Sequence, residues 1–371
     1  MNEYLIIKQI IDQGNNIMQI TEGSVTQTME NNAGQLTKNN AGKLVDTGNV
    51  QILEELNRDI DKLAASLRGF IREQVTAFKK KGVVLGVSGG VDSAVTLTLC
   101  VQEFGKEKVY GLLLPEKESA PSSKTLGAEI CESLGVSYEE VPISPILEAL
   151  NIYEKKDQVL KRACPEYDPE IHKTSLVLPD FLDRELLNVP YIRLIKDGET
   201  VAKHRLKAAD YLELIGLQGV KQRSRMLVQY MYAEKMNYVV CGTTNKTEVV
   251  LGQYVKYGDG GVDLEPLADC YKTQVYALAK HLGVNEAIIK RPPSADTWSH
   301  YTTDEEFYWR MPMHIIDQLL YSREHNMSLE VTEKNTGLPR DTIEKAWRHI
   351  DRVKDTTEYI RAVPPVFYLD R

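Results

Sequence analysis

The spacing of hydrophobic residues changes several times along the chain, and each change predicts an element. From Ile52 to Ile71 apolar residues recur at three- and four-residue steps, which is typical of an amphipathic helix. The runs 83–87 and 109–114 are short and mostly apolar, as buried parallel strands are, and a third strand is predicted near 138–143, with helices between the strands. This alternation predicts an α/β fold with a doubly wound parallel sheet.

The same pattern weakens between residues 146 and 219, where prolines and mixed polarity predict a helical and irregular insertion (150–218) at the rim of the sheet. It resumes with a predicted helix at 221–236, a strand at 238–242 and a helix at 271–282. Residues 292–371 are predicted to form a linker followed by helices. We therefore expect one large domain over residues 51–371.

Residues 1–50 differ from the rest, because they are polar and contain an imperfect repeat, NNAGQLTK (31–38) followed by NNAGKLVD (39–46). Two octapeptides are too few to build a repeat architecture. We predict a poorly ordered arm and assign no chemistry to it.

Charge and cysteine content narrow the possible functions. Lys and Arg number 45 against 53 Asp and Glu, a net charge of -8, which argues against a protein that mainly grips nucleic acid or an anionic membrane. The five cysteines are dispersed without a C-x-x-C pair, as expected of reduced thiols in the cytoplasm. No stretch approaches eighteen apolar residues, and no signal peptide pattern is present. We expect a soluble cytoplasmic protein.

The hexapeptide Ser88-Gly-Gly-Val-Asp-Ser93 joins the first predicted strand to a helix. Gly89 and Gly90 allow the backbone N–H groups to converge on an anion, and the following helix adds its positive end. The hydroxyls of Ser88 and Ser93 can donate to phosphate oxygens. Asp92 would repel phosphate unless a cation lies between them, so we predict that it is a Mg²⁺ ligand. The alternative is a glycine-rich turn with an ordinary helix cap.

This hexapeptide resembles the signature of the ATP-pyrophosphatase (PP-loop) superfamily, whose members cleave ATP to AMP and pyrophosphate. The downstream blocks resemble ammonia-dependent NAD synthetases, in that family's order: Lys221–Met226, Gly242–Glu248, Tyr257–Asp263, Pro266-Leu267 with Lys272, and Pro293–Asp296. The resemblance implies an AMP-forming carbon–nitrogen ligase that uses ATP and Mg²⁺. Nicotinate adenine dinucleotide would become NAD through an acyl-adenylate, with ammonia as nitrogen donor.

The residue types suit that chemistry. Asp92 and Glu248 could hold Mg²⁺ against the departing pyrophosphate, and Lys272 could neutralise the remaining charge. A lysine in the first turn of a helix is unfavourable by ~0.3–1 kcal/mol, which suggests an anion nearby. The alternative for Lys272 is a solvated surface lysine.

Further roles follow from the resemblance. Asp259 is implied to be the ammonia-site carboxylate; its alternative is an Asx-turn in a glycine-rich loop. Arg223 and Arg225 suit phosphates, although ordinary helix-surface charge is the alternative. The remaining predicted contacts are Leu114 and Thr243 for adenine and ribose, and Asp263, Ser294 and Asp296 for the acid substrate. His300 lies in the linker expected to cover that substrate.

The sequence departs from the family after Trp298, where a Gly-Gln pair is missing and Phe307-Tyr308-Trp309 replaces a Leu-Gly region. The 150–215 insertion is also longer than expected. Because these differences lie around the acid substrate, a ligase amidating another carboxylic acid in a specialised pathway is the main alternative. A PP-loop sulfur-transfer or tRNA-modifying enzyme and a nucleotide-binding regulator without activity are weaker ones.

Two expectations concern partners. Fifty polar residues are too few to house a glutaminase, so ammonia is expected to be free or supplied by a separate glutaminase. The resemblance also implies a homodimer with the acid substrate at the subunit interface.

Overall fold

The computed structural model describes residues 36–38, 44–46, 51–177, 190–294, 298–300 and 311–367. The chain divides into two compact units, Met1–Asn49 and Val50–Arg371. In the first unit, strands β1 (Leu36–Lys38) and β2 (Leu44–Asp46) pair in antiparallel fashion. Each strand is the end of one repeat copy. The remainder of the predicted arm lies outside the described residues.

The centre of the second unit is a four-stranded parallel sheet with the strand order β5-β4-β3-β9. The strands are β3 (Val83–Gly86), β4 (Val109–Leu113), β5 (Ser137–Glu140) and β9 (Val239–Val240). Each overlaps a predicted strand and is shorter than predicted. The parallel sheet with helices on both faces confirms the predicted doubly wound α/β fold.

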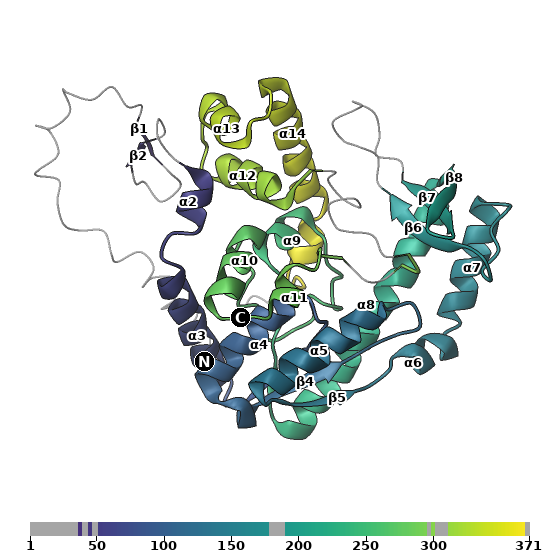
Figure 1. The fold of residues 1–371 in the computed structure, drawn as a ribbon, viewed down its shortest axis with the longest axis horizontal. Helices are drawn as coiled ribbons and strands as arrows, with labels where there is room; N and C mark the ends of the chain where they lie inside the picture. Colours follow the sequence, from purple (N-terminus) through teal and green to yellow (C-terminus); the bar gives the residue numbers. More distant parts are fainter. Residues whose placement is uncertain are drawn as a thin grey trace, which may run out of the picture. The chain divides into compact units, whose positions relative to one another are not determined.

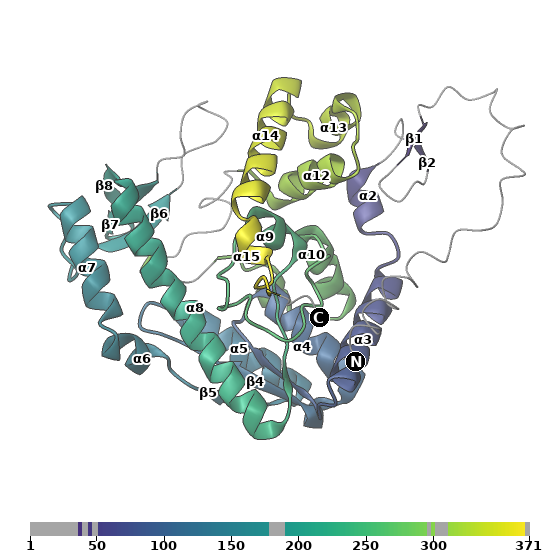
Figure 2. The ribbon, with the colours of Figure 1, turned by 180° about the vertical axis from the view of Figure 1, so that it is seen from behind.

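Alternate residues of the strands face opposite helical layers, as the period of two requires. Val83 and Leu85 belong to a buried cluster with residues of α3, α4 and α10, whereas Val84 and Val240 pack with residues of α8. Figures 1 and 2 show α4 and α5 on one face of the sheet and α8 on the other. These helices are α3 (Ile60–Ala77), α4 (Val91–Phe104), α5 (Pro121–Leu134), α8 (Ala208–Met236) and α10 (Lys272–His281).

The insertion contains more regular structure than the sequence analysis predicted. Helix α6 (Ser144–Ala149) precedes the insertion. Besides α7 (Ile152–Ala163), the insertion holds an antiparallel sheet of β6 (Lys173–Val177), β7 (Tyr191–Lys196) and β8 (Glu199–Arg205). The sequence analysis predicted irregular structure in this part of the insertion, and the structure shows an antiparallel sheet instead. Asp197 and Gly198 form the tight β7–β8 turn with φ values of 53° and 85°. An Asp-Gly pair between apolar runs is a strong hairpin signal, and it was available in the sequence.

Helix α8 is also longer than predicted, since it begins at Ala208 rather than at Lys221. Its first half packs against the insertion, where Leu214 is buried with Val159, Leu160 and Leu176. One uninterrupted helix therefore connects the insertion to the parallel sheet.

A buried group of charges joins these two parts. Lys221 on α8 donates to Glu116 (2.8 Å) and Glu118 (2.6 Å), and Lys156 on α7 pairs with Glu118. Although burial raises the pKa of Glu118, the charges of Lys156 and Lys221 lower it below its usual value. Both carboxylates lie in the segment after β4, so the cluster holds that segment against α7 and α8.

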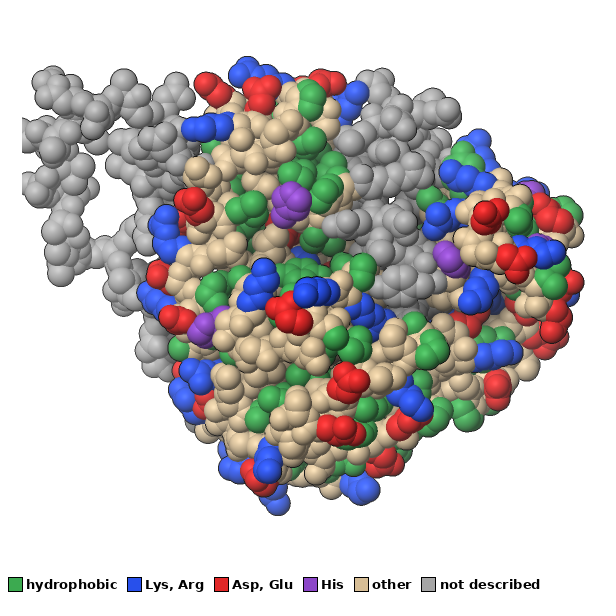
Figure 3. All heavy atoms as spheres, in the orientation of Figure 1, with side chains coloured by type: hydrophobic (Ala, Val, Ile, Leu, Met, Phe, Trp, Pro, Cys, Tyr) green, Lys and Arg blue, Asp and Glu red, His purple; other side chains and the backbone are tan. Residues whose placement is uncertain are grey.

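The C-terminal region is helical, as predicted. Buried residues of α2 (Ile52–Leu56), α9 (Lys246–Leu251), α12 (Met313–Glu324), α13 (Leu329–Thr336) and α14 (Arg340–Thr356) form one hydrophobic cluster. Short helices α11 (Glu286–Ile289) and α15 (Glu358–Arg361) and the 3₁₀ helix η1 (Lys106–Lys108) complete the described elements. None of the described helices has both the length and the apolar character needed to cross a membrane. On the face seen in Figure 3, acidic and basic side chains are interspersed over the described elements.

Candidate active site

A cavity of about 870 Å³ opens at the carboxyl ends of β3 and β4. It is lined by the 88–93 loop, the end of β4, one face of α8, the loops that follow β9, and parts of the 291–300 linker. Ligands of open α/β sheets bind outside the carboxyl ends of the strands, so this is where the fold favours a site.

The 88–93 loop turns sharply into α4. Gly89 has φ of 71°, and a Cβ there would lie 2.5 Å from the backbone oxygen of Ser123. The Ser88 and Ser93 hydroxyls lie 3.2 Å apart, and Ser93 Oγ donates to the Gly90 carbonyl (2.9 Å). Helix α4 begins at Val91, and its N-cap residue Gly90 makes no side-chain cap, which leaves first-turn N–H groups for an anion. Ser88, Gly90, Asp92 and Ser93 line the cavity, while Gly89 allows the turn.

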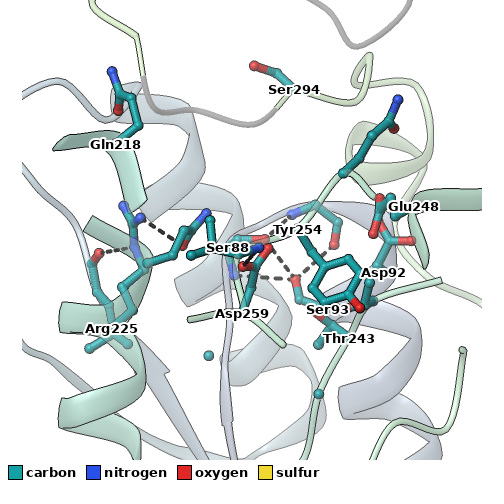
Figure 4. Close-up of a pocket in the computed structure, with 18 of the residues that line it drawn as sticks. Ser88, Asp92, Ser93, Gln218, Arg225, Thr243, Glu248, Tyr254, Asp259 and Ser294 are labelled. Carbon is teal, nitrogen blue, oxygen red and sulfur yellow. Dashed lines mark hydrogen bonds between the residues drawn. The ribbon is translucent and has the colours of Figure 1, made fainter. Parts of the chain in front are cut away.

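Lys272 joins two carboxylates from distant parts of the chain. Its Nζ lies 2.6 Å from Asp92 Oδ2 and 3.3 Å from Glu248 Oε1, and the residue is only 2% exposed. Asn245, which caps α9, also donates to Asp92 Oδ1 (2.9 Å). The first-turn lysine therefore faces anions, as the dipole argument predicts, and a solvated surface lysine is excluded. Figure 4 shows Asp92 and Glu248 side by side in the cavity.

Asp317 on α12 positions this group, and the sequence analysis missed it. Its fully buried carboxylate accepts hydrogen bonds from Thr247 Oγ1 (2.6 Å) and the Thr273 N–H (2.7 Å). Thr247 Oγ1 in turn accepts the Lys272 N–H (3.0 Å). Asp317 thus fixes the first turns of α9 and α10 relative to each other. An acid on the apolar face of a predicted helix was the available signal.

The carboxylates suit a magnesium ion. Because Asp92 and Glu248 contact the same Nζ atom, their oxygens lie within about 6 Å of each other. Mg²⁺ is commonly held by one or two carboxylates, with phosphate oxygens and water completing its coordination. Among the described residues no group of three or more His, Cys, Asp or Glu side chains could hold a metal by itself. The donor set therefore fits an ion that arrives with a phosphate ligand.

Asp259 lines the centre of the cavity, and its Oδ1 accepts the Val255 N–H (2.7 Å). Burial raises its pKa to about 6, although backbone N–H groups and the Arg225 charge act in the opposite direction. The bond to Val255 stabilises the loop, but it runs to an earlier residue and so is no Asx-turn. The carboxylate remains in contact with the cavity.

A second acid near this loop, Glu265, was also missed. Burial raises its pKa to about 8, with a further contribution from the negative charge of Asp259. Its Oε2 accepts the Thr244 N–H (3.3 Å), and a Cβ on Gly242 would lie within 2.3–2.6 Å of its carboxylate. The position of this acid between Leu264 and Pro266 was the available signal in the sequence.

The other predicted residues divide into three groups. Leu114, Thr243, Arg223, Arg225 and Ser294 line the cavity. Asp263 is not among the lining residues; it accepts the Val240 N–H (2.8 Å) and the Tyr230 hydroxyl (3.0 Å) at the end of β9. Asp296 lies outside the described residues.

The linker brings an arginine to the phosphate loop. Arg291 Nη2 donates to Ser123 Oγ (2.6 Å) and Nη1 to the Gly89 carbonyl (3.4 Å). Further along, the His300 N–H donates to Thr174 O (3.1 Å), so this part of the linker lies against β6. His300 lines the cavity, as expected of a residue in this linker.

Comparisons with known proteins agree with this geometry. The sequence profile of the NAD synthase family matches residues 63–164 and 186–364. The NH₃-dependent NAD⁺ synthetase of Mesorhizobium japonicum is 35% identical over 306 residues, 82% of this chain and 95% of the relative. The corresponding enzyme of Thermotoga maritima is 38% identical over 264 residues, 71% of this chain and 88% of the relative.

Solved structures show the same fold. The NH₃-dependent NAD synthetase of Campylobacter jejuni matches with a TM-score of 0.55 at 25% identity, covering 84% of this chain and 99% of its own. The NMN synthetase of Francisella tularensis matches with a TM-score of 0.57 at 22% identity, covering 83% and 99%, which is a likeness of fold alone.

Substituting Gly89→Ala should weaken ATP binding at least roughly tenfold, because the loop must move away from Ser123 O to accept a Cβ. Gly337→Ala is the matched control: Gly337 also has positive φ (70°), but nothing lies within 4 Å of its added Cβ. Both variants should lose about 1 kcal/mol or more of stability from the left-handed backbone. Calorimetric titration with ATP measures the difference, and equal ATP affinities in the two variants would contradict the assignment of the loop.

Proposed function

The chain belongs to the NAD synthase family, and we propose that it amidates nicotinate adenine dinucleotide with ammonia, cleaving ATP to AMP and pyrophosphate. The observation that carries this proposal is the Lys272 ammonium between Asp92 and Glu248, where the 88–93 loop runs into α4. That arrangement places two carboxylates and one cation where a polyphosphate would bind. The α/β PP-loop fold and the carbon–nitrogen ligase class follow from the family.

ATP binds with its phosphates at the 88–93 loop in this proposal. The Ser88 and Ser93 hydroxyls and the first N–H groups of α4 face the phosphates, and Leu114 and Thr243 line the adenosine side of the cavity. Asp92 and Glu248 would hold Mg²⁺, which supplies positive charge to the departing pyrophosphate. Lys272 adds a fixed cation at the same place, and Arg291 adds another from the linker.

The reaction has two steps. An oxygen of the substrate carboxylate attacks the α-phosphorus of ATP, the bond to the β-phosphate oxygen breaks, and pyrophosphate leaves. Ammonia then attacks the carbonyl carbon of the acyl-adenylate, the nitrogen loses a proton, and the bond to the AMP oxygen breaks. We assign the proton acceptor role to Asp259, because it faces the cavity with a pKa near the physiological range.

Arg223 and Arg225 from α8 and Ser294 from the linker are assigned to the acid substrate. We propose Asp296 and Asp263 as further contacts to the acid substrate. The exposed position of Asp263 at the end of β9 suits a substrate that extends beyond the cavity.

A ligase for a different acid is the second candidate, and one observation favours it. The family departures at 150–215 and after Trp298 meet in space, because the linker is bonded to β6 of the insertion, and both line the cavity.

Sulfur transfer is disfavoured, because the five cysteines are buried and burial raises the pKa of Cys131 and Cys270 to about 12. The free, buried thiols also support the cytoplasmic location.

The decisive experiment incubates the purified protein with Mg-ATP, ammonium and a panel of carboxylic acids, and follows AMP release. Nicotinate adenine dinucleotide should be turned over, and glutamine in place of ammonium should support at least roughly tenfold less AMP formation unless a glutaminase is added. Asp92→Asn should lower the rate by ~10²-fold or more, since it removes a carboxylate that acts on the transition state. Silence with the dinucleotide alongside turnover of another acid would refute the main proposal in favour of the second.

Asp259 predicts a pH dependence. The base must be ionised, so its contribution is present above a pKa of about 6 and is lost as the pH falls through that value. At saturating ammonium the rate of amide formation should therefore fall about tenfold for each pH unit below 6. Asp259→Asn should be slower by ~10²-fold or more and should lack this acid limb. A wild-type rate that stays constant between pH 7 and 5 would exclude Asp259 as the base.

We also propose a homodimer, with exposed apolar residues of α8 at the interface. Leu227 and Met231 lie one helical turn apart and are 59% and 56% exposed. A double Leu227→Glu, Met231→Glu variant should sediment as a monomer and lose activity, because the substitutions place like charges opposite each other across a two-fold axis. Leu150→Glu, an exposed leucine at the end of α6, is the control and should leave the sedimentation unchanged. Equal sedimentation of the double variant and wild type would exclude α8 from the interface.

A further inference from the structure

Gln218 is a buried side chain whose hydrogen-bonding capacity is unused among the described residues. It is 9% exposed, and neither its Nε2 nor its Oε1 has a partner there. A primary amide offers two donors and two acceptor sites, and burying it without partners is unfavourable. Gln218 also lines the active-site cavity. A buried, unpaired amide at the wall of a binding cavity points to a ligand that completes its hydrogen bonds.

One face of α8 carries Gln218 into the cavity. Tyr211, Ile215, Gln218, Gln222 and Arg225 follow at steps of four, three, four and three residues, and all of them line the cavity. Gln222 Oε1 already accepts a hydrogen bond from Arg225 Nη1 (3.1 Å), in contrast to Gln218. The amide of Gln218 therefore has hydrogen-bonding groups available to a ligand that enters the cavity.

The cavity that Gln218 lines also has apolar and aromatic walls, which suit a flat, uncharged ring. Leu176 on β6 and Trp298 in the linker belong to one buried cluster, against which Tyr211 packs, and all three line the cavity. In Figure 4, Gln218 lies at the opposite end of the labelled group from Asp92 and Glu248, with Arg225 beneath it. A nucleotide base at this end would have apolar and aromatic walls, while its phosphates would extend toward the arginines.

We propose that Gln218 is a specificity residue that binds the edge of an adenine base; this inference rests on the proposed function. A glutamine amide pairs with adenine through two hydrogen bonds: Oε1 accepts from the exocyclic amino group and Nε2 donates to the adjacent ring nitrogen. A base with a carbonyl at that carbon, such as hypoxanthine, would place two acceptors face to face. The adenine belongs either to ATP or to the dinucleotide substrate, and these two sources are separable by experiment.

The test substitutes Gln218→Met, which keeps an unbranched side chain of similar length and removes both hydrogen bonds. Because the amide is unpaired in the free protein, the melting temperature should stay the same or rise. The KM of one adenine-bearing substrate should increase roughly 5- to 100-fold, the range expected for a bidentate contact to a base. Gln158→Met is the control, since Gln158 is an exposed glutamine on α7.

The arms identify the source of the adenine. If ATP supplies it, the KM for ATP rises and the preference for ATP over inosine triphosphate collapses in the variant. If the acid supplies it, the KM for nicotinate adenine dinucleotide rises, and the preference for it over nicotinate mononucleotide, which lacks adenine, is lost. Gln218→Glu, which retains the acceptor and loses the donor, should fall between wild type and Gln218→Met in the affected substrate.

Failure of this inference is distinguishable from failure of the proposed function. An active wild-type enzyme whose KM values for ATP and for the dinucleotide both change less than twofold in Gln218→Met would overturn the inference alone. A lower melting temperature with unchanged KM values would likewise overturn it, because the amide would then have a structural role. If the wild type does not turn over the dinucleotide, calorimetric titration with ATP and with inosine triphosphate still tests whether Gln218 binds the adenine of ATP.

Discussion

The ammonium group of Lys272, held between Asp92 and Glu248, is the interaction on which the site depends. Its three members come from the first turns of α4, α9 and α10, which are far apart in the sequence. A buried lysine is strongly unfavourable without partners, and the two carboxylates without the lysine would repel each other. The three helix starts must therefore converge at one end of the sheet. Their convergence places the first backbone N–H groups of α4 and the Lys272 ammonium beside the same space.

A buried acid and a buried cluster of four charges hold segments that line this cavity. At the phosphate end, Asp317 holds α9 and α10 together through Thr247 and the Thr273 N–H. Beside α7 and α8, Lys221 and Lys156 hold the segment after β4 through Glu116 and Glu118. Removing one member of the lysine–glutamate cluster leaves a buried charge without a partner, which costs about 3–5 kcal/mol. These groups specify where the lining segments lie, in addition to any net stability they contribute.

Sequence analysis predicted the features that depend on interactions between residues close together in the sequence or on the chemistry of a single motif. The apolar run before Ser88 predicted a buried strand, the repulsion between Asp92 and phosphate predicted a cation, and the misplaced charge at the start of α10 predicted anions around Lys272. Asp317 and Gln218 could not be found in this way, because their partners or lack of partners arise from packing between distant helices. The insertion sheet is an intermediate case: β8 is mostly exposed and polar, so its alternation was weak, although its turn was readable. The roles of Asp259, Asp263 and the arginines came from resemblance and stay predictions.

The residues that match the family and the residues that depart from it lie at different ends of the same cavity. The 88–93 loop, the 242–248 loop and Lys272 surround the phosphate end, where the chemistry of every AMP-forming ligase is the same. The insertion, the start of α8 and the linker near Trp298 contribute to the other end, where apolar walls and the unpaired amide of Gln218 lie near the arginines of α8. A strongly preorganised ionic end tolerates little change, because each member is buried against a partner. An apolar end can change its shape at the cost of packing alone, so substrate identity can diverge while the activation chemistry is retained.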